Sequence, residues 1–290
     1  MDHMTAKVSC FARAFHHRHY PVHVFDDSVA ENLLGEDYDL IARNFSHGIK
    51  FFFPDFCGSD EEGLATIVEK QLAPSVLARS AFCENMLVEH MENGCHQYLV
   101  FGSGYDTYAI RNKEKQLVVY ELDLPEMISD KKRRIESAKL QSDAIYIPCD
   151  LSEAKWQSQL LKCGFVSDRK TFCSLSGISY YLTKDAFQTL LRSVSDICPA
   201  GSVICLDYPS PDDSLESRIN RSLAQGAGEK MQSQYAVEEM KEIMEACRFH
   251  VCDHLDSEAM TERYFSTYNR QCPEHVMEAP GGVYYMLAEK

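Results

Sequence analysis

The chain has 290 residues, of which 45% are hydrophobic and 25% charged, a composition typical of a globular protein large enough to bury a full core. Its formal net charge of −15 argues against nucleic acid and anionic membranes as main partners, because both bind basic surfaces. Its 12 cysteines form no C-x-x-C pair, and neither a signal peptide nor a membrane-spanning apolar stretch is visible, so we expect a cytoplasmic protein with free thiols.

The first 90 residues show helical and irregular patterns without the alternation of strands. No Pro/Gly/Ser-rich linker divides them from the rest, so we expect one domain over residues 1–290 with an N-terminal helical cap over 1–90. This segment carries His16, His17, His19 and His23. Their spacing spreads them around a helix end and no Cys or acid completes a set of ligands, so we predict no metal site.

The most informative stretch lies between residues 97 and 123. An apolar run at 98–101 meets Gly102 and Gly104, followed by Asp106, and a second apolar run at 117–120 closes in Glu121 and Asp123. The pattern predicts a strand, a glycine turn, a short helix and a second strand tipped with carboxylates. In a parallel sheet this arrangement is typical of a crevice that holds a nucleoside-bearing cofactor.

Strand and helix patterns then alternate along the chain. We predict helices over 125–140, 152–161, 184–194 and 236–247, and further strands over 144–147, 171–175, 202–206, 249–253 and 283–287. The cations at 131–134 are expected on a solvated helix face. Residues 209–235, helical from 215 to 234, are expected to form a lid-like insertion. The predicted fold is a doubly wound α/β protein with a seven-stranded, mostly parallel sheet and an antiparallel edge strand.

The glycine turn also bears on the class of cofactor. A dinucleotide site favours a third small residue where this chain has Thr107, and an anionic Asp106 would repel a pyrophosphate. The same acid suits a cofactor with a cationic ammonium and sulfonium, such as S-adenosylmethionine. A nicotinamide-dependent oxidoreductase and a cofactor-binding protein without turnover remain the alternatives.

Several motifs together resemble the leucine carboxyl methyltransferase family, and its bacterial small-molecule O-methyltransferase branch in particular. They are FDDSVAENLL at 25–34, FGSGYDT at 101–107, YELDLPE at 120–126 and SGISYYL at 176–182. The resemblance covers most of the chain. It implies a Rossmann-like methyltransferase fold, S-adenosyl-L-methionine as the cofactor and transfer of a methyl group to a small-molecule acceptor.

The resemblance also implies roles for residues at the methionine end of the cofactor. Arg79, expected just after a helix at 71–77, matches the arginine that pairs with the cofactor's carboxylate, a task suited to a guanidinium. Gly102 and Gly104 match the glycines beneath the methionine moiety, and Asp106 matches the acid beside them.

Further matches concern the adenosyl end. Asp123 corresponds to the acid that binds the ribose, with Glu121 as the alternative, and Asp150 and Leu151 correspond to the pair that meets the adenine. One departure stands out: Ser176 occupies a position where the family often has Glu, so a contact near the cofactor and the acceptor is not carried over.

The methyl acceptor is expected between the strand ends, the cap and the insertion. A carboxylate acceptor needs no general base, because it is ionised at neutral pH, and this fits a chain without an obvious catalytic dyad. We therefore expect O-methylation of a small molecule, with a carboxylate favoured, and assign no catalytic residue. Arg13, Arg221 and Tyr181 are candidate contacts to the acceptor.

Overall fold

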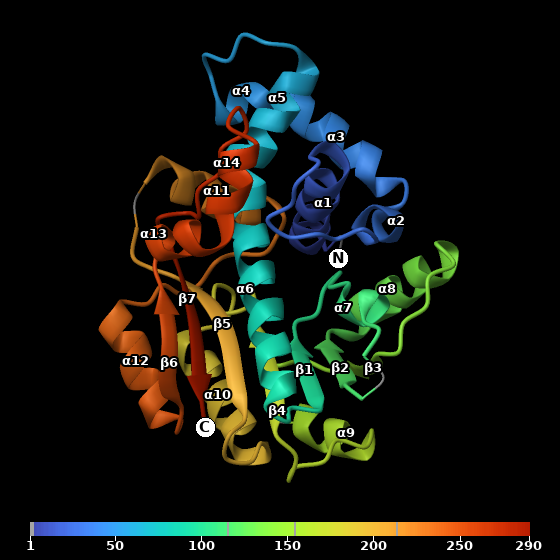
Figure 1. Cartoon of the computed structure of the whole chain (residues 1–290), viewed down its shortest axis with the longest axis vertical. Coiled ribbons are helices and arrows are strands. Elements are labelled where there is room, and N and C mark those ends of the chain that lie inside the picture. Colours follow the sequence, from blue (N-terminus) through green and yellow to red (C-terminus); the bar gives the residue numbers. More distant parts are fainter. Residues whose placement is uncertain (1–2, 115, 154, 213) are drawn as a thin grey trace.

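A single seven-stranded sheet forms the centre of the protein in the computed structural model, which describes residues 3–114, 116–153, 155–212 and 214–290 (Figure 1). The strand order is β3-β2-β1-β4-β5-β7-β6. The strands are β1 (Gln97–Phe101), β2 (Val118–Asp123), β3 (Ile145–Pro148), β4 (Thr171–Leu175), β5 (Val203–Pro209), β6 (His250–Leu255) and β7 (Val283–Glu289). All seven predicted strands are present, and the doubly wound α/β class is confirmed.

The late strands refine the predicted antiparallel pair. β7 runs antiparallel to both β5 and β6, whereas β1 pairs parallel with β2 and β4. The strand that runs in the opposite direction is thus β7, and it lies one position inside the edge that β6 forms. The connection from β6 to β7 contains α13 (Ser257–Met260), η2 (Thr261–Phe265) and α14 (Ser266–Gln271), and β7 returns beside β6 in the opposite direction.

Alternate residues of the strands enter two separate cores, one on each face of the sheet. Tyr98 and Val100 of β1 pack in the core beneath α6 (Ala73–Glu92), while Leu99 and Phe101 pack in the other. The second core includes the apolar faces of α9 (Trp156–Lys162), α10 (Lys184–Ile197) and α12 (Val237–Ala246). Every residue of β1, β4 and β5 is buried, as expected for strands covered on both faces.

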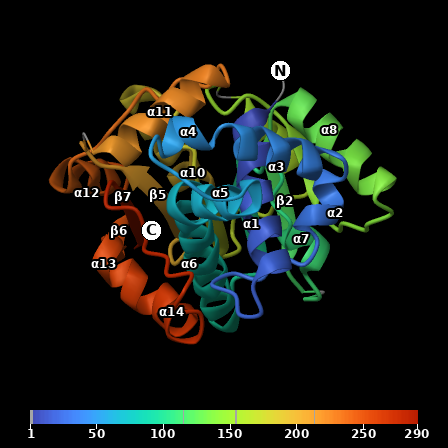
Figure 2. The same cartoon turned by 90° about the horizontal axis from the view of Figure 1, so that it is seen from above.

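Short helices precede α6 and gather beyond one end of the sheet (Figures 1 and 2). They are α1 (Met4–His19), α2 (Ala30–Leu34), α3 (Asp37–His47), α4 (Ile49–Phe52), α5 (Asp60–Ile67) and the π-helix η1 (Val68–Leu72). The expectation of a helical, strand-free segment is met over its described part; residues 1 and 2 lie outside the described residues. Because α6 leads directly into β1, this group lies at the end of the sheet towards which the parallel strands point.

The predicted helix over 215–234 is shorter than expected. α11 covers Leu215–Gly226, and Gly228 with φ of 80° ends it. The N–H groups of Glu229 and Gly228 donate to the carbonyls of Ala224 and Gln225, the pattern of a Schellman cap. The residues after the cap leave the helix and run back along the end of the sheet. Residue 213 of the predicted insertion lies outside the described residues.

The remaining helices are α7 (Tyr108–Arg111), α8 (Pro125–Ser137), α13 (Ser257–Met260), the π-helix η2 (Thr261–Phe265) and α14 (Ser266–Gln271). α8 is three residues shorter than predicted (137 against 140), and Lys139 with φ of 55° follows it. The prediction that 131–134 is a solvated face is wrong for Lys131, which is fully buried. None of the helices in the described ranges combines the length and apolar character that a membrane crossing needs.

Candidate active site

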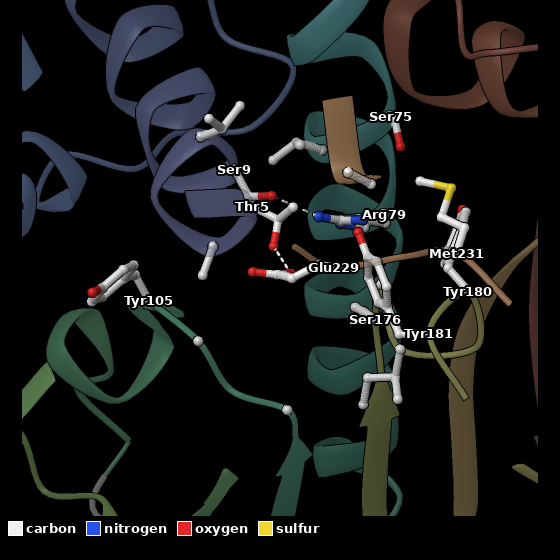
Figure 3. Close-up of a pocket in the computed structure, with 18 of the residues that line it drawn as sticks. Thr5, Ser9, Ser75, Arg79, Tyr105, Ser176, Tyr180, Tyr181, Glu229 and Met231 are labelled. Atoms are coloured by element: carbon white, nitrogen blue, oxygen red, sulfur yellow. Dashed lines mark hydrogen bonds between the residues drawn. The ribbon is translucent and has the colours of Figure 1, made fainter. Parts of the chain in front are cut away.

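A cavity of about 1120 Å³ opens at the carboxyl ends of β1, β2 and β4, between α1, α6 and α11. Figure 3 shows residues of α1, α6 and the segment after α11 converging on it. The structure brings all seven residues predicted to bind the cofactor to this one cavity. They are Arg79, Gly102, Gly104, Asp106, Asp123, Asp150 and Leu151.

The glycine turn after β1 forms the floor of the cavity. Gly102 and Gly104 have φ of 61° and 48°, values that L-residues with a Cβ adopt only with strain. The N–H groups of Gly102 and Ser103 both donate to the Leu122 carbonyl at 2.8 and 3.2 Å. The turn is therefore tied to β2, and its backbone lies directly against the cavity.

Asp123 is held by two main-chain groups at the end of β2. Its Oδ2 accepts from the Gly104 N–H at 2.7 Å and its Oδ1 from the Leu124 N–H at 2.7 Å. Burial raises the pKa of Asp123, and these two hydrogen bonds oppose the shift. A carboxylate has about four acceptor positions, so an oriented Asp123 retains acceptors for hydroxyl groups in the cavity.

Asp106 lies on the rim of the same turn. Its Oδ1 accepts from the Tyr108 N–H at 2.8 Å at the start of α7. Thr107, which occupies the position of a third glycine, donates its hydroxyl to Asp27 at 2.7 Å. The side chain that replaces the glycine therefore connects the turn to the N-terminal segment, and a turn of this shape differs from that of a dinucleotide site.

Arg79 enters the cavity from α6. The prediction that it follows a helix is wrong: α6 begins at Ala73, and Pro74 in its first turn does not interrupt it. The Arg79 Nη2 donates to the Ser9 hydroxyl at 3.1 Å, and Nη1 lies 3.7 Å from Oδ2 of Asp207. Figure 3 shows the partly exposed guanidinium of Arg79 entering the cavity from α6.

Asp207 is a residue to which the sequence assigned no role. It lies at the end of β5 and is 1% exposed. Its Oδ1 accepts from the Gly177 N–H at 2.6 Å and its Oδ2 from the Tyr180 hydroxyl at 3.0 Å. The available signal was an acid at a strand end, as at Asp123. Asp207 lies behind Arg79 and orients the guanidinium.

Asp150 and Leu151 follow β3 at the far side of the cavity. The Asp150 Oδ1 accepts from the N–H and the hydroxyl of Ser152 at 2.8 and 2.6 Å. This turn delays α9, which begins at Trp156 instead of the expected 152. Leu151 is half-buried and presents an apolar surface to the cavity. Ser176 lines the cavity after β4.

The alternative assignment of the ribose-binding acid to Glu121 is wrong. Its side chain is fully buried and forms an ion pair with Lys131 of α8. Neither residue lines the cavity. Because Lys131 neutralises Glu121 inside the protein, Asp123 is the acid of β2 that faces the cavity.

The three candidate contacts to the acceptor all line the cavity. Arg13, however, donates to Asp27 at 2.8 Å and to the Tyr105 carbonyl at 2.7 Å, so it braces the glycine turn against α1. Arg221 donates to the Asp212 carbonyl at 2.9 Å. Burial raises the pKa of Tyr181 to about 12.

The segment after α11 contacts α1 and the end of β4 across the cavity. The hydroxyl of Thr5 donates to Glu229, as Figure 3 shows. The Gln232 N–H donates to the Tyr180 carbonyl at 2.7 Å. Thr5 and Ser9 lie four residues apart on one face of α1, and the sequence analysis assigned neither a role.

The expectation that no acid accompanies the histidines is wrong. The loop after α1 turns back, so that Oδ1 of Asp26 lies 2.6 Å from Nδ1 of His17 and 3.5 Å from Nδ1 of His23. Sequence order alone could not reveal this return of the chain.

The strand order and the cavity at the carboxyl ends of β1 and β2 define the fold class, a Rossmann-like α/β protein with a site at the strand ends. Two solved structures share this fold. One is a duf574 family protein from Streptomyces avermitilis, with a TM-score of 0.56 and 14% identity over 84% of this chain and 96% of that one. The other is described as a methyltransferase from Thermobifida fusca, with a TM-score of 0.57 and 14% identity over 86% and 94%.

Sequence comparison then identifies the family. The family model for leucine carboxyl methyltransferase matches residues 6–195. The Bacillus subtilis protein YktD, named as an S-adenosyl-L-methionine-dependent methyltransferase, is 30% identical over 280 residues, 91% of each chain. A Mycobacterium marinum protein named in the same way is 28% identical over 155 residues, 52% of this chain and 49% of that one. The chain belongs to the leucine carboxyl methyltransferase family, and the resemblance noted in the sequence is confirmed.

S-adenosyl-L-methionine is accordingly the cofactor of this methyltransferase. The residues present fit it, because the cavity offers acids, Asp106 and Asp123, beside the glycine turn and a cation, Arg79, on α6. These charges complement a cofactor that carries both a cationic sulfonium and a carboxylate.

Proposed function

We propose that the protein methylates an oxygen atom of a small-molecule acceptor, with a carboxylate as the favoured nucleophile. Residues 1–90 act as a cap and 209–235 as a lid over the cavity at the strand ends. Arg79, Gly102, Gly104, Asp106, Asp123, Asp150 and Leu151 bind the cofactor. The cofactor supplies an electrophilic methyl group on its sulfonium.

The chemistry of the cavity lining is the observation that carries this proposal. Among the described residues that line the cavity, His3 at the start of α1 is the one imidazole. Burial raises the pKa of Tyr180 well above its usual value and that of Tyr181 to about 12. These phenols stay protonated at neutral pH and are poor general bases.

The carboxylates of the lining already have partners. Both oxygens of Glu84 pair with Arg111, Asp123 accepts from two main-chain N–H groups, and Glu229 accepts from Thr5. In this proposal Asp123 is committed to the ribose, Glu84 to Arg111 and Glu229 to Thr5, and none of the three is assigned as a general base. An acceptor that is ionised before it binds needs no such base.

Methyl transfer from a sulfonium is an in-line displacement, so the protein's task is to hold the two partners in line and exclude water. Arg79 and Asp207 orient the carboxylate end of the cofactor, and Asp123 orients the ribose. The contact between Thr5 and Glu229 closes one side of the cavity, which limits access of water to the methyl group.

A panel of acceptors tests the proposal. The protein is incubated with S-adenosylmethionine and with matched pairs of small carboxylic acids and the corresponding alcohols, and release of S-adenosylhomocysteine is measured. We expect turnover with acids, and a product that liberates methanol in mild base, as methyl esters do. Turnover confined to alcohols, phenols or amines contradicts the carboxylate assignment.

The pH profile provides a second criterion. With a carboxylate acceptor, kcat/KM is flat from about pH 6 to 8, because an acid of pKa about 4 is already ionised. A rise through this range indicates a general base. Membership of the methyltransferase family argues against a nicotinamide-dependent oxidoreductase. Tight cofactor binding without turnover on any acceptor would favour a cofactor-binding protein without catalytic activity.

A further inference from the structure

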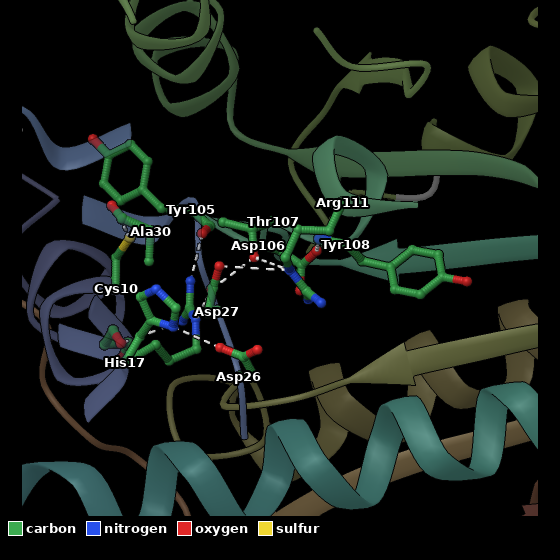
Figure 4. Close-up of polar contacts among 12 residues, drawn as sticks. Cys10, His17, Asp26, Asp27, Ala30, Tyr105, Asp106, Thr107, Tyr108 and Arg111 are labelled. Atoms are coloured by element: carbon green, nitrogen blue, oxygen red, sulfur yellow. Dashed lines mark hydrogen bonds and ion pairs between the residues drawn. The ribbon is translucent and has the colours of Figure 1, made fainter. Parts of the chain in front are cut away.

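A group of three metal-ligating side chains lies outside the cavity, where the loop after α1 returns to the helix. The His–Asp triad consists of His17, His23 and Asp26, and one ligand atom from each lies within 4.8 Å of the other two. Figure 4 shows His17 facing Asp26. None of the three residues lines the cavity, so cofactor binding and methyl transfer do not account for their proximity.

One of the distances within the triad matches that between ligand atoms of a tetrahedral metal site. Zn²⁺ binds imidazole nitrogen and carboxylate oxygen at about 2.0–2.2 Å, which places neighbouring ligand atoms roughly 3.3–3.6 Å apart. Asp26 Oδ1 lies 3.5 Å from Nδ1 of His23 and 2.6 Å from Nδ1 of His17. Small side-chain rotations therefore suffice to admit an ion in place of the proton that His17 and Asp26 share.

The ring of His23 is already oriented as a ligand. Its Nε2 lies 3.2 Å from the main-chain carbonyl of His17, and a carbonyl can only accept. His23 thus carries a proton on Nε2, and its Nδ1 is the ring nitrogen that faces Asp26. Metal-bound histidines usually make this kind of hydrogen bond from the other ring nitrogen to a carbonyl or carboxylate.

A buried neighbour holds the loop in place without a metal. His16 is fully buried, and its Nε2 accepts from the Val24 N–H at 2.9 Å. Because Val24 follows His23 directly, the ligand side of the loop is preorganised against α1.

We propose that the His–Asp triad binds one divalent transition-metal ion of the Zn²⁺ class. Two imidazoles and one carboxylate are the ligand types such ions prefer, and the 62% exposed side chain of Asp26 leaves room for water at the fourth position. The same loop presents Phe25 to the cavity and Asp27 to Arg13. A bound ion fixes the position of this loop and supports the cap.

The test is a calorimetric titration of the tag-free, chelator-treated full chain with ZnCl₂. The exposed thiols of Cys57, Cys163 and Cys252 can also bind zinc, so the readout is the difference between the wild type and variants. We expect the affinity for one equivalent of Zn²⁺ to fall at least about tenfold in His23→Ala and in Asp26→Asn. Loss of a residue that only supports a ligand already lowers metal affinity about 10–100-fold. His47→Ala, an exposed histidine on α3, is the matched control and keeps the wild-type isotherm.

A second measurement guards against misfolding. Asp26→Asn changes an exposed side chain and conserves its shape, so its metal-free melting temperature should equal that of the wild type. ZnCl₂ should raise the melting temperature of the wild type and of His47→Ala more than that of Asp26→Asn. Isotherms that are identical in the wild type and both triad variants overturn the proposal. This outcome is independent of the methyl acceptor.

Discussion

Replacing Arg79 by alanine removes the cation that we assign to the carboxylate of the cofactor. A hydrogen bond to a charged group contributes about 1.5–3 kcal/mol, so the variant should bind the cofactor roughly 10- to 150-fold more weakly. The fold should survive. Asp207, the buried partner of Arg79, keeps the Gly177 N–H and the Tyr180 hydroxyl as donors at 2.6 and 3.0 Å.

The assay is calorimetric titration with S-adenosylhomocysteine, which carries the carboxylate without the sulfonium charge. The matched control is Arg133→Ala, because Arg133 lies on α8 with a side chain that is 66% exposed. Arg79→Ala should lose affinity, and Arg133→Ala should bind like the wild type. Equal affinities in all three proteins would refute the assignment of Arg79.

Three further substitutions extend the account. Asp207→Asn turns an amide donor towards Arg79. It should weaken cofactor binding about tenfold, measured by calorimetry, and lower the free energy of unfolding by about 1–3 kcal/mol, measured by urea unfolding. Unchanged cofactor binding would show that Asp207 does not position Arg79. Asp123→Asn presents an NH₂ group to the N–H groups of Gly104 or Leu124, and should weaken binding of S-adenosylmethionine by at least about tenfold; tight binding would show that another acid meets the ribose. Burial lowers the pKa of His16 to about 3, so the unfolded chain binds a proton at a higher pH than the folded protein does. The free energy of unfolding should therefore fall by up to about 1.4 kcal/mol per pH unit as the pH drops from about 6.5 towards 3. His16→Gln should reduce that slope in acid unfolding experiments, and an unchanged slope would contradict the assignment.

The strands and their order of appearance could be predicted from the sequence because most are apolar runs of ordinary strand length; β6, with His250, Asp253 and His254, is the exception. β4 appears with the predicted bounds, Thr171–Leu175. The ends of the helices were harder to predict, because each depends on a single cap residue. Gly228 ends α11 well before the end of the helix predicted over residues 215–234.

The cofactor cavity could be anticipated because its acids lie at strand ends that a parallel sheet brings to one edge. Contacts that depend on the return of distant segments could not. An example is the bond from Arg13 to the Tyr105 carbonyl, which joins residues 92 positions apart. The burial of Lys131 against Glu121 likewise follows from the packing of α8 on β2, which a local charge pattern does not encode.

A crystal structure of the complex with S-adenosylhomocysteine tests the central claim most directly. The account predicts the amino-acid carboxylate at the guanidinium of Arg79, the ribose hydroxyls at Asp123 and the adenine beside Asp150 and Leu151. Density for the ligand outside this cavity, or in the cavity with its carboxylate at Asp106 and Asp123, would contradict it.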